Sequence, residues 1–288
     1  MSLGKRLISG AKILDGDLSG ASSYASKTLT VGSQGEPLGG CISADGTRLI
    51  TTHKSSNQHW FNQYNFSTAF DVTSIGTVQK TYQTTATIEN YMTGCIINKD
   101  LDWISYDPYY TNNYYSQPLG TAGDISTAGT IYTNTCVRSG GERTSSSQFL
   151  SRNEDTLYLQ YDAIKAITLS TPGDLSSGDG ANSDCGTTTS ISFVDSDLGS
   201  NTRSCQFNHD GTKFYGGGDE NGKIVQYDLS TAYDISSKGT GTVFDLSSII
   251  GNLSVRFMQF NDDMSHILLF GRGGTSGSRT HEVWDLKL

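Results

Sequence analysis

The chain lacks the segments that membranes and nucleic acids require. Its 288 residues contain no apolar stretch of membrane-spanning length, and the N-terminus has no apolar core typical of a signal peptide. The net charge is −9, and the only cluster of basic residues is the pair Lys5 and Arg6. Because nucleic acids and anionic membranes attract basic surfaces, we expect neither of them as the main partner.

Cysteine and histidine are few and widely spaced. The five cysteines include no Cys-x-x-Cys pair, and the five histidines show no spacing typical of metal ligands. Cys41, Cys95 and Cys205 occupy corresponding positions of repeated segments, where we interpret them as small buried side chains. These patterns predict neither a disulfide framework nor a metal site, and they indicate a protein made in a reducing compartment.

Common catalytic motifs are also missing. The sequence has no nucleophile elbow, no phosphate-binding glycine loop and no dinucleotide fingerprint. Residues 15–20, DGDLSG, resemble the start of a calcium loop, but Ser26 stands where the closing glutamate is required. The sequence therefore predicts no catalytic residue, no metal and no cofactor.

An internal repeat is what the sequence does contain. NFSTAFDVTS at residues 65–74 returns as DLSTAYDISS at residues 228–237, with weaker copies at 119–126 and 169–176. A second repeated motif is an acidic turn that follows a short apolar strand. Its turn residues, spaced 55, 53, 57 and 53 residues apart, are Asp45, Asp100, Asn153, Asp210 and Asp263. Five units of this length account for nearly the whole chain, which predicts five structural repeats.

The two ends of the chain complement each other. The last unit stops at residues 283–288, VWDLKL, and the loop that should follow it stands at residues 15–19, DGDLS. Asp17 lies 54 residues before Asp71, in phase with the other units. An N-terminal strand that completes the C-terminal unit closes a ring and leaves no long unpaired edge.

Each unit is predicted to form four short strands, which in the fourth unit are residues 203–208, 212–215, 223–229 and 238–246. No window shows a sustained 3.6-residue apolar period, and 33 glycines with only 35% hydrophobic residues suit short strands and polar turns. We therefore predict an all-β protein, a five-bladed β-propeller of four-stranded antiparallel blades. Residues 1–10 are expected to be a tail and residues 11–288 a single propeller domain.

An aspartate recurs in the loop of every unit. These loop aspartates are Asp17, Asp71, Asp124, Asp174 and Asp234. A catalytic site needs one or two special carboxylates, whereas an aspartate in a turn commonly accepts hydrogen bonds from nearby backbone N–H groups. The repetition therefore favours a structural role.

The loops that differ between units are expected on the opposite face of the propeller, and recognition usually uses such loops. The loop richest in aromatic residues is 106–115, YDPYYTNNYY, and Trp60 lies in the corresponding region of the first unit. Aromatic side chains there can anchor a partner, or they can alternate inward and pack between blades. The candidate binding residues are Trp60, Tyr109, Tyr110, Tyr114 and Tyr115.

The repeat at residues 210–237, DGTKFY followed by VQYDLSTAYDISS, resembles that of β-propeller proteins frequent in tailed bacteriophages, especially marine ones. The resemblance covers all five units and is strongest in the first and fourth. It implies a virion protein, made in the host cytoplasm, with a structural or receptor-binding role. The expected partner is another virion protein or a host-surface glycan, and no reaction is implied.

A non-enzymatic interaction module is thus the favoured expectation, and two alternatives stay open. A five-bladed glycoside hydrolase needs two carboxylates about 5 to 10 Å apart. Candidates near the variable face, which nothing in the sequence pairs, are Asp107, Glu142, Asp162 and Glu220. The other alternative is a lectin-type propeller that binds sugars.

Overall fold

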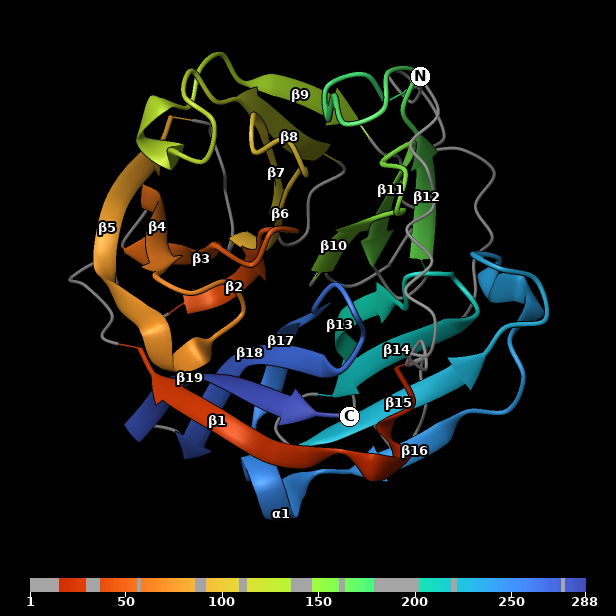
Figure 1. The fold of residues 1–288 in the computed structure, drawn as a ribbon. Helices are drawn as coiled ribbons and strands as arrows, with labels where there is room; N and C mark the ends of the chain where they lie inside the picture. Colours follow the sequence, from red (N-terminus) through yellow and green to blue (C-terminus); the bar gives the residue numbers. More distant parts are fainter. Residues whose placement is uncertain are drawn as a thin grey trace.

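The computed structural model is a five-bladed β-propeller, which confirms the predicted fold (Figure 1). It describes residues 16–29, 37–55, 58–85, 92–108, 113–135, 147–160, 164–178, 202–218, 222–275 and 278–288. The innermost strands of the blades contact one another in ring order around a central channel. The expected tail, residues 1–10, lies outside the described residues.

The strands of each blade run outward from the channel as an antiparallel sheet. Blade one contains β2 Pro37–Ile42, β3 Arg48–Ser55, β4 Gln58–Phe66 and β5 Ile75–Thr84. Blade two contains β6 Met92–Ile97, β7 Trp103–Pro108, β8 Asn113–Pro118 and β9 Tyr132–Thr135. Three strands of blade three are described, β10 Ser147–Leu150, β11 Thr156–Gln160 and β12 Ile164–Thr168.

Blade four shows how closely the predicted strands match the structure. It contains β13 Thr202–Phe207, β14 Lys213–Gly218, β15 Lys223–Asp228 and β16 Thr242–Asp245. The second strand is longer than predicted because Gly216 to Gly218 continue it. The fourth strand is shorter, because the 3₁₀ turn η5 Ile235–Ser237 and the residues after it precede the strand.

Blade five is completed by the N-terminal segment, as predicted. It contains β17 Ser254–Phe260, β18 His266–Thr275 and β19 Ser278–Lys287, with β1 Ser22–Thr28 as its outer strand. β1 pairs antiparallel with β19, from Ser22 opposite Lys287 to Thr28 opposite Glu282. The turn before β1, η1 Leu18–Gly20, buries Leu18 in the core. The ring is therefore closed by pairing between the two ends of the chain.

The first turn of every blade, between its two inner strands, is held by one recurring hydrogen bond. A serine or asparagine side-chain oxygen accepts from the backbone N–H five residues later, at 2.9 to 3.1 Å. The five acceptors are Ser43, Asn98, Ser151, Asn208 and Asn261. Such a bond fixes a tight turn because a backbone donor that would otherwise be unpaired is satisfied locally.

The loop aspartates make an equally regular contact. Each carboxylate accepts from the backbone N–H two residues later, at 2.8 to 3.0 Å, in Asp17, Asp71, Asp124, Asp174 and Asp234. In blade one this begins η2 Val72–Ser74, and in blade two it begins η3 Ile125–Thr127. The carboxylates thus act as N-caps of short turns.

Two residues in every blade have a left-handed backbone, with φ between 57° and 82°, and they face each other. One lies in the first turn and the other directly precedes the loop aspartate. In each pair one residue is glycine and the other places its side chain beside it. The pairs are Gly46 and Phe70, Leu101 and Gly123, Glu154 and Gly173, Gly211 and Tyr233, and Met264 and Gly16. A Cβ on Gly46 would lie 2.3 Å from the Phe70 ring, so the space admits one side chain.

Neighbouring blades are joined by glutamine side chains on their third strands. Gln63 of blade one accepts from the N–H of Ile125 in blade two at 3.1 Å. Gln226 of blade four accepts from the N–H of Leu18 at 3.2 Å. Since Leu18 follows Asp17 as Ile125 follows Asp124, the N-terminal segment takes the place of an ordinary blade loop.

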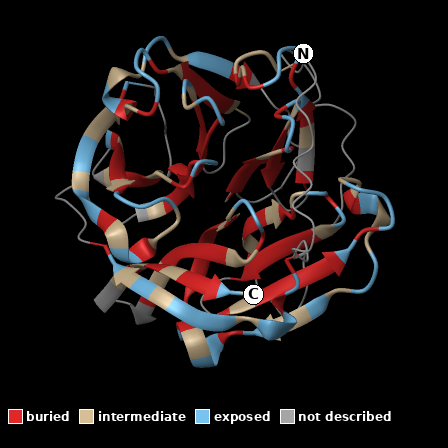
Figure 2. Cartoon of the chain, in the orientation of Figure 1, coloured by how far each residue is buried: buried red, intermediate tan, exposed pale blue. Residues whose placement is uncertain are grey.

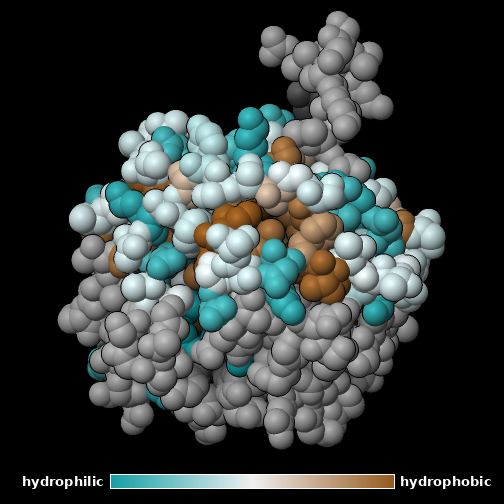
Figure 3. Space-filling view, turned by 90° about the horizontal axis from the view of Figure 1, so that it is seen from below, coloured by the Kyte–Doolittle hydropathy of each residue, from teal (hydrophilic) through white to brown (hydrophobic). Residues whose placement is uncertain are grey.

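Burial decreases from the channel outward (Figure 2). Most residues of the inner strands are buried, whereas many residues of the outer strands β1 and β5 are exposed. In the coloured part of Figure 3, which views the molecule from the side that bears β1 and α1 Ser247–Ile250, the surface is mostly polar with a small apolar group. Partly buried apolar residues packed on the core there include Ala21, Phe244 and Ile249. None of the helices in the described ranges has the length and apolar character of a membrane span.

The ring closure generates a stability prediction. Deletion of residues 1–31 should lower the Tm by about 10 °C or more, because it removes the outer strand and the buried Leu18 and leaves β19 as an exposed edge. Thermal unfolding followed by circular dichroism measures the shift. Deletion of residues 1–10 alone is the control and should leave the Tm unchanged. Equal Tm values for the wild type and the longer deletion would contradict this account of closure.

Candidate functional site

A cavity of about 310 Å³ lies at the end of the central channel where the first turns of all five blades meet. Its inner wall is apolar, formed at the ends of the inner strands by Ile42, Ile97, Leu150, Phe207 and Phe260. This volume is at the lower end of the range typical of small-molecule sites. It suits one small ligand.

The rim of the cavity is built from one equivalent position in each blade. This is the residue that directly follows the turn-holding serine or asparagine, and in blade order it is Ala44, Lys99, Arg152, His209 and Asp262. The backbone around it repeats five times, but its side chain differs in every blade. The scaffold therefore presents a small residue, two cations, an imidazole and a carboxylate around one opening.

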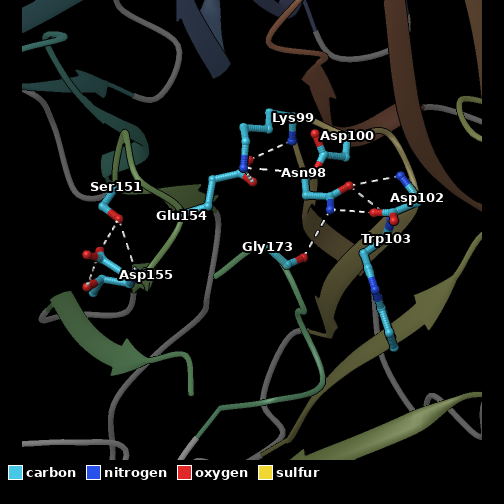
Figure 4. A network of polar contacts seen from close by, with 10 residues as sticks. Asn98, Lys99, Asp100, Asp102, Trp103, Ser151, Glu154, Asp155 and Gly173 are labelled. Atoms are coloured by element: carbon cyan, nitrogen blue, oxygen red, sulfur yellow. Dashed lines mark hydrogen bonds and ion pairs between the residues drawn. The ribbon is translucent and has the colours of Figure 1, made fainter. Parts of the chain in front are cut away.

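Lys99 and Glu154 connect blades two and three at this rim (Figure 4). The Glu154 carboxylate accepts from the backbone N–H of Lys99 at 2.6 Å and from its ammonium group at 3.2 Å. Burial raises the pKa of Glu154, and the bonds from Lys99 offset this only in part. The same carboxylate raises the pKa of Lys99. We interpret Glu154 as an ionised group held by its partner, because both of its oxygens accept from Lys99.

Glu154 also stands out within the left-handed pairs. In the other four blades the side chain that covers the glycine is apolar or aromatic, whereas in blade three it is this carboxyl group. Its φ is 57°, a conformation that costs a residue with a Cβ of order 1 kcal/mol. Asn98 strengthens the same joint by donating to the carbonyl of Gly173 at 3.0 Å.

Blades three and four meet at His209. Its carbonyl accepts from the Tyr233 hydroxyl at 2.6 Å and from the Arg152 guanidinium at 3.4 Å. Burial lowers the pKa of the His209 imidazole, and the positive charge of Arg152 lowers it further. The imidazole is therefore neutral at pH 7; its N–H engages the backbone of Asp262, and the other ring nitrogen is an acceptor.

The remaining polar wall consists of amides. Gln206 of blade four donates to the side-chain oxygen of Gln259 in blade five at 3.3 Å, and both line the cavity. The charged lining residues balance, since Lys99 and Arg152 face Glu154 and Asp262. No group of three histidine, cysteine, aspartate or glutamate side chains in the described ranges is placed to hold a metal ion.

The aromatic residues predicted as a contact surface have other positions. Tyr114 and Tyr115 lie on β8 and are 2% and 7% exposed, so their rings cannot anchor a partner from the surface. Successive residues of a strand point to opposite faces. Tyr115 accordingly stacks on Tyr106, with ring centroids 5.6 Å apart, while the Tyr114 hydroxyl lies beside Gly178 of blade three. Tyr114 thus packs between blades two and three and Tyr115 packs on its cross-strand neighbour in blade two, so both rings are turned inward, which is the alternative that the sequence left open.

The other predicted residues are only partly described by the structure. Trp60 is half-buried on β4, and Tyr109 and Tyr110 lie outside the described residues. Of the carboxylates considered for a glycoside hydrolase, Asp107 is fully buried on β7. Glu142, Asp162 and Glu220 lie outside the described residues.

The cavity lies on the face of the repeated turns and loops, opposite to the face that we expected to carry recognition. Sequence reasoning missed it because the repeated turns were interpreted as scaffold throughout. One signal was present: the residue directly before the five repeated turn residues (Asp45, Asp100, Asn153, Asp210 and Asp263) changes from alanine to lysine, arginine, histidine and aspartate. When one residue inside a repeated turn changes its chemical type from blade to blade, the fold does not require a particular side chain at that position.

Comparisons with known proteins bear on the fold. No protein-family model matches the chain, and no relative was found among curated proteins. A periplasmic gluconolactonase of Pseudomonas aeruginosa has 12% identity and a TM-score of 0.48, over 85% of this chain and 70% of that one. A putative 6-phosphogluconolactonase of Bacteroides fragilis has 13% identity and a TM-score of 0.48, over 90% and 69%. At such identities the similarity concerns the propeller architecture alone.

The expectation of a non-enzymatic phage module needs correction. The similar solved structures include the two above, a putative 6-phosphogluconolactonase of Bacteroides uniformis and Hsv2 of Kluyveromyces lactis, and none of these is described as a virion protein. These comparisons give a virion or tail role no support.

The strained conformation of Glu154 generates a second prediction. Replacing Glu154 by alanine should cost about 1 to 3 kcal/mol of unfolding free energy, because Lys99 loses both of its bonds. Glu154→Gly should cost about 1 kcal/mol less than Glu154→Ala, since glycine adopts a positive φ without strain. Urea unfolding of both variants measures the difference. At Ala128, where φ is −56°, the order of alanine and glycine should be reversed. An alanine variant of Glu154 more stable than the glycine variant would contradict the strain at this position.

Proposed function

We propose that the chain is a carbohydrate-binding propeller that holds one small sugar, or a sugar derivative, at the mouth of its central channel. The observation that carries the proposal is the cavity of about 310 Å³ whose rim position differs chemically in every blade. A rigid frame with variable side chains around one opening is typical of a binding site.

The chemistry of the lining suits a polar, nearly neutral ligand. Two cations and two carboxylates balance each other, so the cavity does not favour a polyanion. Planar amide, guanidinium and carboxylate groups can each engage two neighbouring hydroxyl groups, and Gln206, Arg152 and Asp262 supply one of each kind. Phe207 and Phe260 offer apolar surface for the C–H groups of a sugar ring.

A second function, hydrolysis of a sugar lactone or ester, is favoured by the state of His209. A neutral imidazole can act as a general base, taking a proton from the water that attacks a carbonyl carbon and returning it to the leaving oxygen. The positively charged Arg152 guanidinium lines the same cavity, and a positive charge stabilises an oxyanion. A glycosidase mechanism is less well supported, because Glu154 is engaged by Lys99 through both oxygens.

The binding proposal is tested by closing the cavity. Ala44 is exposed at the rim, so Ala44→Trp should fill the opening without disturbing the core. Calorimetric titration with neutral monosaccharides, sugar acids, sugar lactones and amino acids identifies the ligand class. For the sugar that binds the wild type best, the variant should lose at least about tenfold in affinity, equal to about 1.4 kcal/mol.

Ala122→Trp is the matched control, because Ala122 is exposed in a blade loop and does not line the cavity. It should bind as the wild type does. Failure of the wild type to bind any sugar, or undiminished binding by Ala44→Trp, would refute the proposal. Binding of amino acids in place of sugars would reassign the ligand class.

The hydrolase alternative makes its own prediction about pH. Because burial and Arg152 place the pKa of His209 below its usual value of 6.5, the imidazole is unprotonated and active as a base at pH 7. The rate of lactone hydrolysis should therefore be at its maximum at neutral pH. It should fall as the pH drops through that lowered pKa, because the imidazole then becomes protonated. His209→Gln should reduce the rate at least about a hundredfold while sugar binding persists. An unchanged rate in that variant would exclude His209 as the base.

A further inference from the structure

Two of the free cysteines meet across the joint between blades one and two. Cys41 lies on β2 and Cys95 on β6, which are neighbouring inner strands, and both are buried. Their sulfur atoms are 3.3 Å apart, and the Cys95 thiol donates to the sulfur of Cys41.

The contact exists because the two cysteines are not at equivalent positions, contrary to the sequence interpretation. Cys41 stands two residues before Ser43, which holds its turn, whereas Cys95 stands three residues before Asn98. Successive residues of a strand point to opposite faces, so this offset turns Cys41 toward blade two and Cys95 back toward blade one. Cysteines at the same repeat position would both point the same way around the ring and would not meet.

The third described cysteine shows the contrast. Cys205 stands three residues before Asn208, as Cys95 does before Asn98. In blade three the position that corresponds to Cys41 is occupied by Phe149, and Cys205 packs in a cluster with it. Among the described inner strands, a pair of facing thiols is thus confined to the joint between blades one and two.

The two backbones are also held unusually close at this joint. A Cβ on Gly39 would lie 1.8 Å from the carbonyl oxygen of Thr93, so only glycine permits the approach. The Thr52 hydroxyl donates to the carbonyl of Met92 at 2.9 Å and fastens the same two blades. A disulfide requires sulfur atoms about 2.0 Å apart, so closure by about 1.3 Å completes the bond.

We propose that Cys41 and Cys95 are an oxidation site, at which hydrogen peroxide forms an intramolecular disulfide that locks blade one to blade two. The Cys41 sulfur attacks one peroxide oxygen and the O–O bond breaks, so that Cys41 becomes a sulfenic acid, and the departing hydroxide takes the proton of the Cys41 thiol and leaves as water. The Cys95 sulfur then attacks the Cys41 sulfur and displaces hydroxide, which leaves as a second water with the Cys95 proton. Two thiols have lost two electrons, and one peroxide has been reduced to two water molecules.

The order of the two steps follows from the hydrogen bond. Cys95 donates to the Cys41 sulfur, so Cys41 is the sulfur that peroxide oxidises first and Cys95 lies beside it as the resolving thiol. Burial raises the pKa of Cys95, and Cys41 beside it raises it further, so Cys95 keeps its proton until the second step. Peroxide is small enough to reach a buried pair through local opening of the joint.

The bond would form directly behind the cavity wall. Ile42 and Ile96 each follow one of the two cysteines in sequence and line the cavity. The inference itself does not depend on sugar binding, and the two can fail separately.

Peptide mapping of the oxidised protein is the decisive test. Folded wild-type protein is treated with hydrogen peroxide, its remaining thiols are blocked with N-ethylmaleimide, and it is digested with trypsin. The expected product is residues 28–48 cross-linked to residues 81–99, which dithiothreitol separates. Because the bond closes a loop of 54 residues, the Tm should rise by about 5 °C and return on reduction.

Two matched variants complete the test. Cys205→Ala keeps the pair and should form the cross-link and show the rise in Tm. Cys95→Ala removes one partner and should show neither. Maleimide on both peptides, sulfinic acid without a cross-link, or a cross-link to another cysteine in the wild type would each overturn the proposal, and none of these results depends on a variant folding.

Discussion

Closure of the ring is the constraint on which the rest of the structure depends. A blade buries both of its faces against its neighbours, so the same geometry must be met at five joints, and an unpaired blade edge would remain if the chain simply stopped at its last strand. The pairing of β1 with β19 removes that edge, and Gln226 accepts from Leu18 as Gln63 accepts from Ile125. The repeated turns serve the same requirement. Serine or asparagine holds the first turn and an aspartate caps the loop in every blade, so each blade has the same two turns.

The left-handed pairs show how the repeats tolerate divergence. Every blade has one glycine and one side chain that covers it. The glycine can lie in the first turn or before the loop aspartate, and the covering side chain then comes from the other position. Blade one has its glycine in the first turn and Phe70 in the loop, whereas blade two reverses this with Leu101 and Gly123. The constraint acts on the pair because the space between the turns holds one side chain. Blade three meets it with Glu154, and a carboxyl group brought to the channel mouth then requires a cation, which Lys99 of blade two supplies.

The sequence predicted the fold well because the fold is repetitive. Five copies of a turn anchor reveal a period that no single copy would, and the phase of Asp17 relative to Asp71 located the closing strand. The register within a repeat was less accessible. Cys41 seemed equivalent to Cys95 because both stand near the end of an apolar strand. Cys41 stands two residues before the side chain that holds its turn and Cys95 stands three, and this offset decides which neighbouring blade each side chain faces. For the same reason the sequence did not decide whether the tyrosines of β8 are exposed or buried. Successive side chains of a strand point to opposite faces, but the sequence does not say whether neighbouring blades cover both of those faces.

The candidate site escaped the sequence for a related reason. A functional position was sought in the loops that differ, whereas the cavity is built from the one position that differs inside turns that are otherwise the same. The backbone there is fixed by the bond that Ser43, Asn98 or its equivalent accepts, so the turn does not depend on the side chain that follows. Alanine, lysine, arginine, histidine and aspartate at such a position have no packing reason to differ, because their tips lie at the open rim. Each blade has instead contributed a different chemical group to a common opening, and a site that no single repeat contains arises only when the ring is closed.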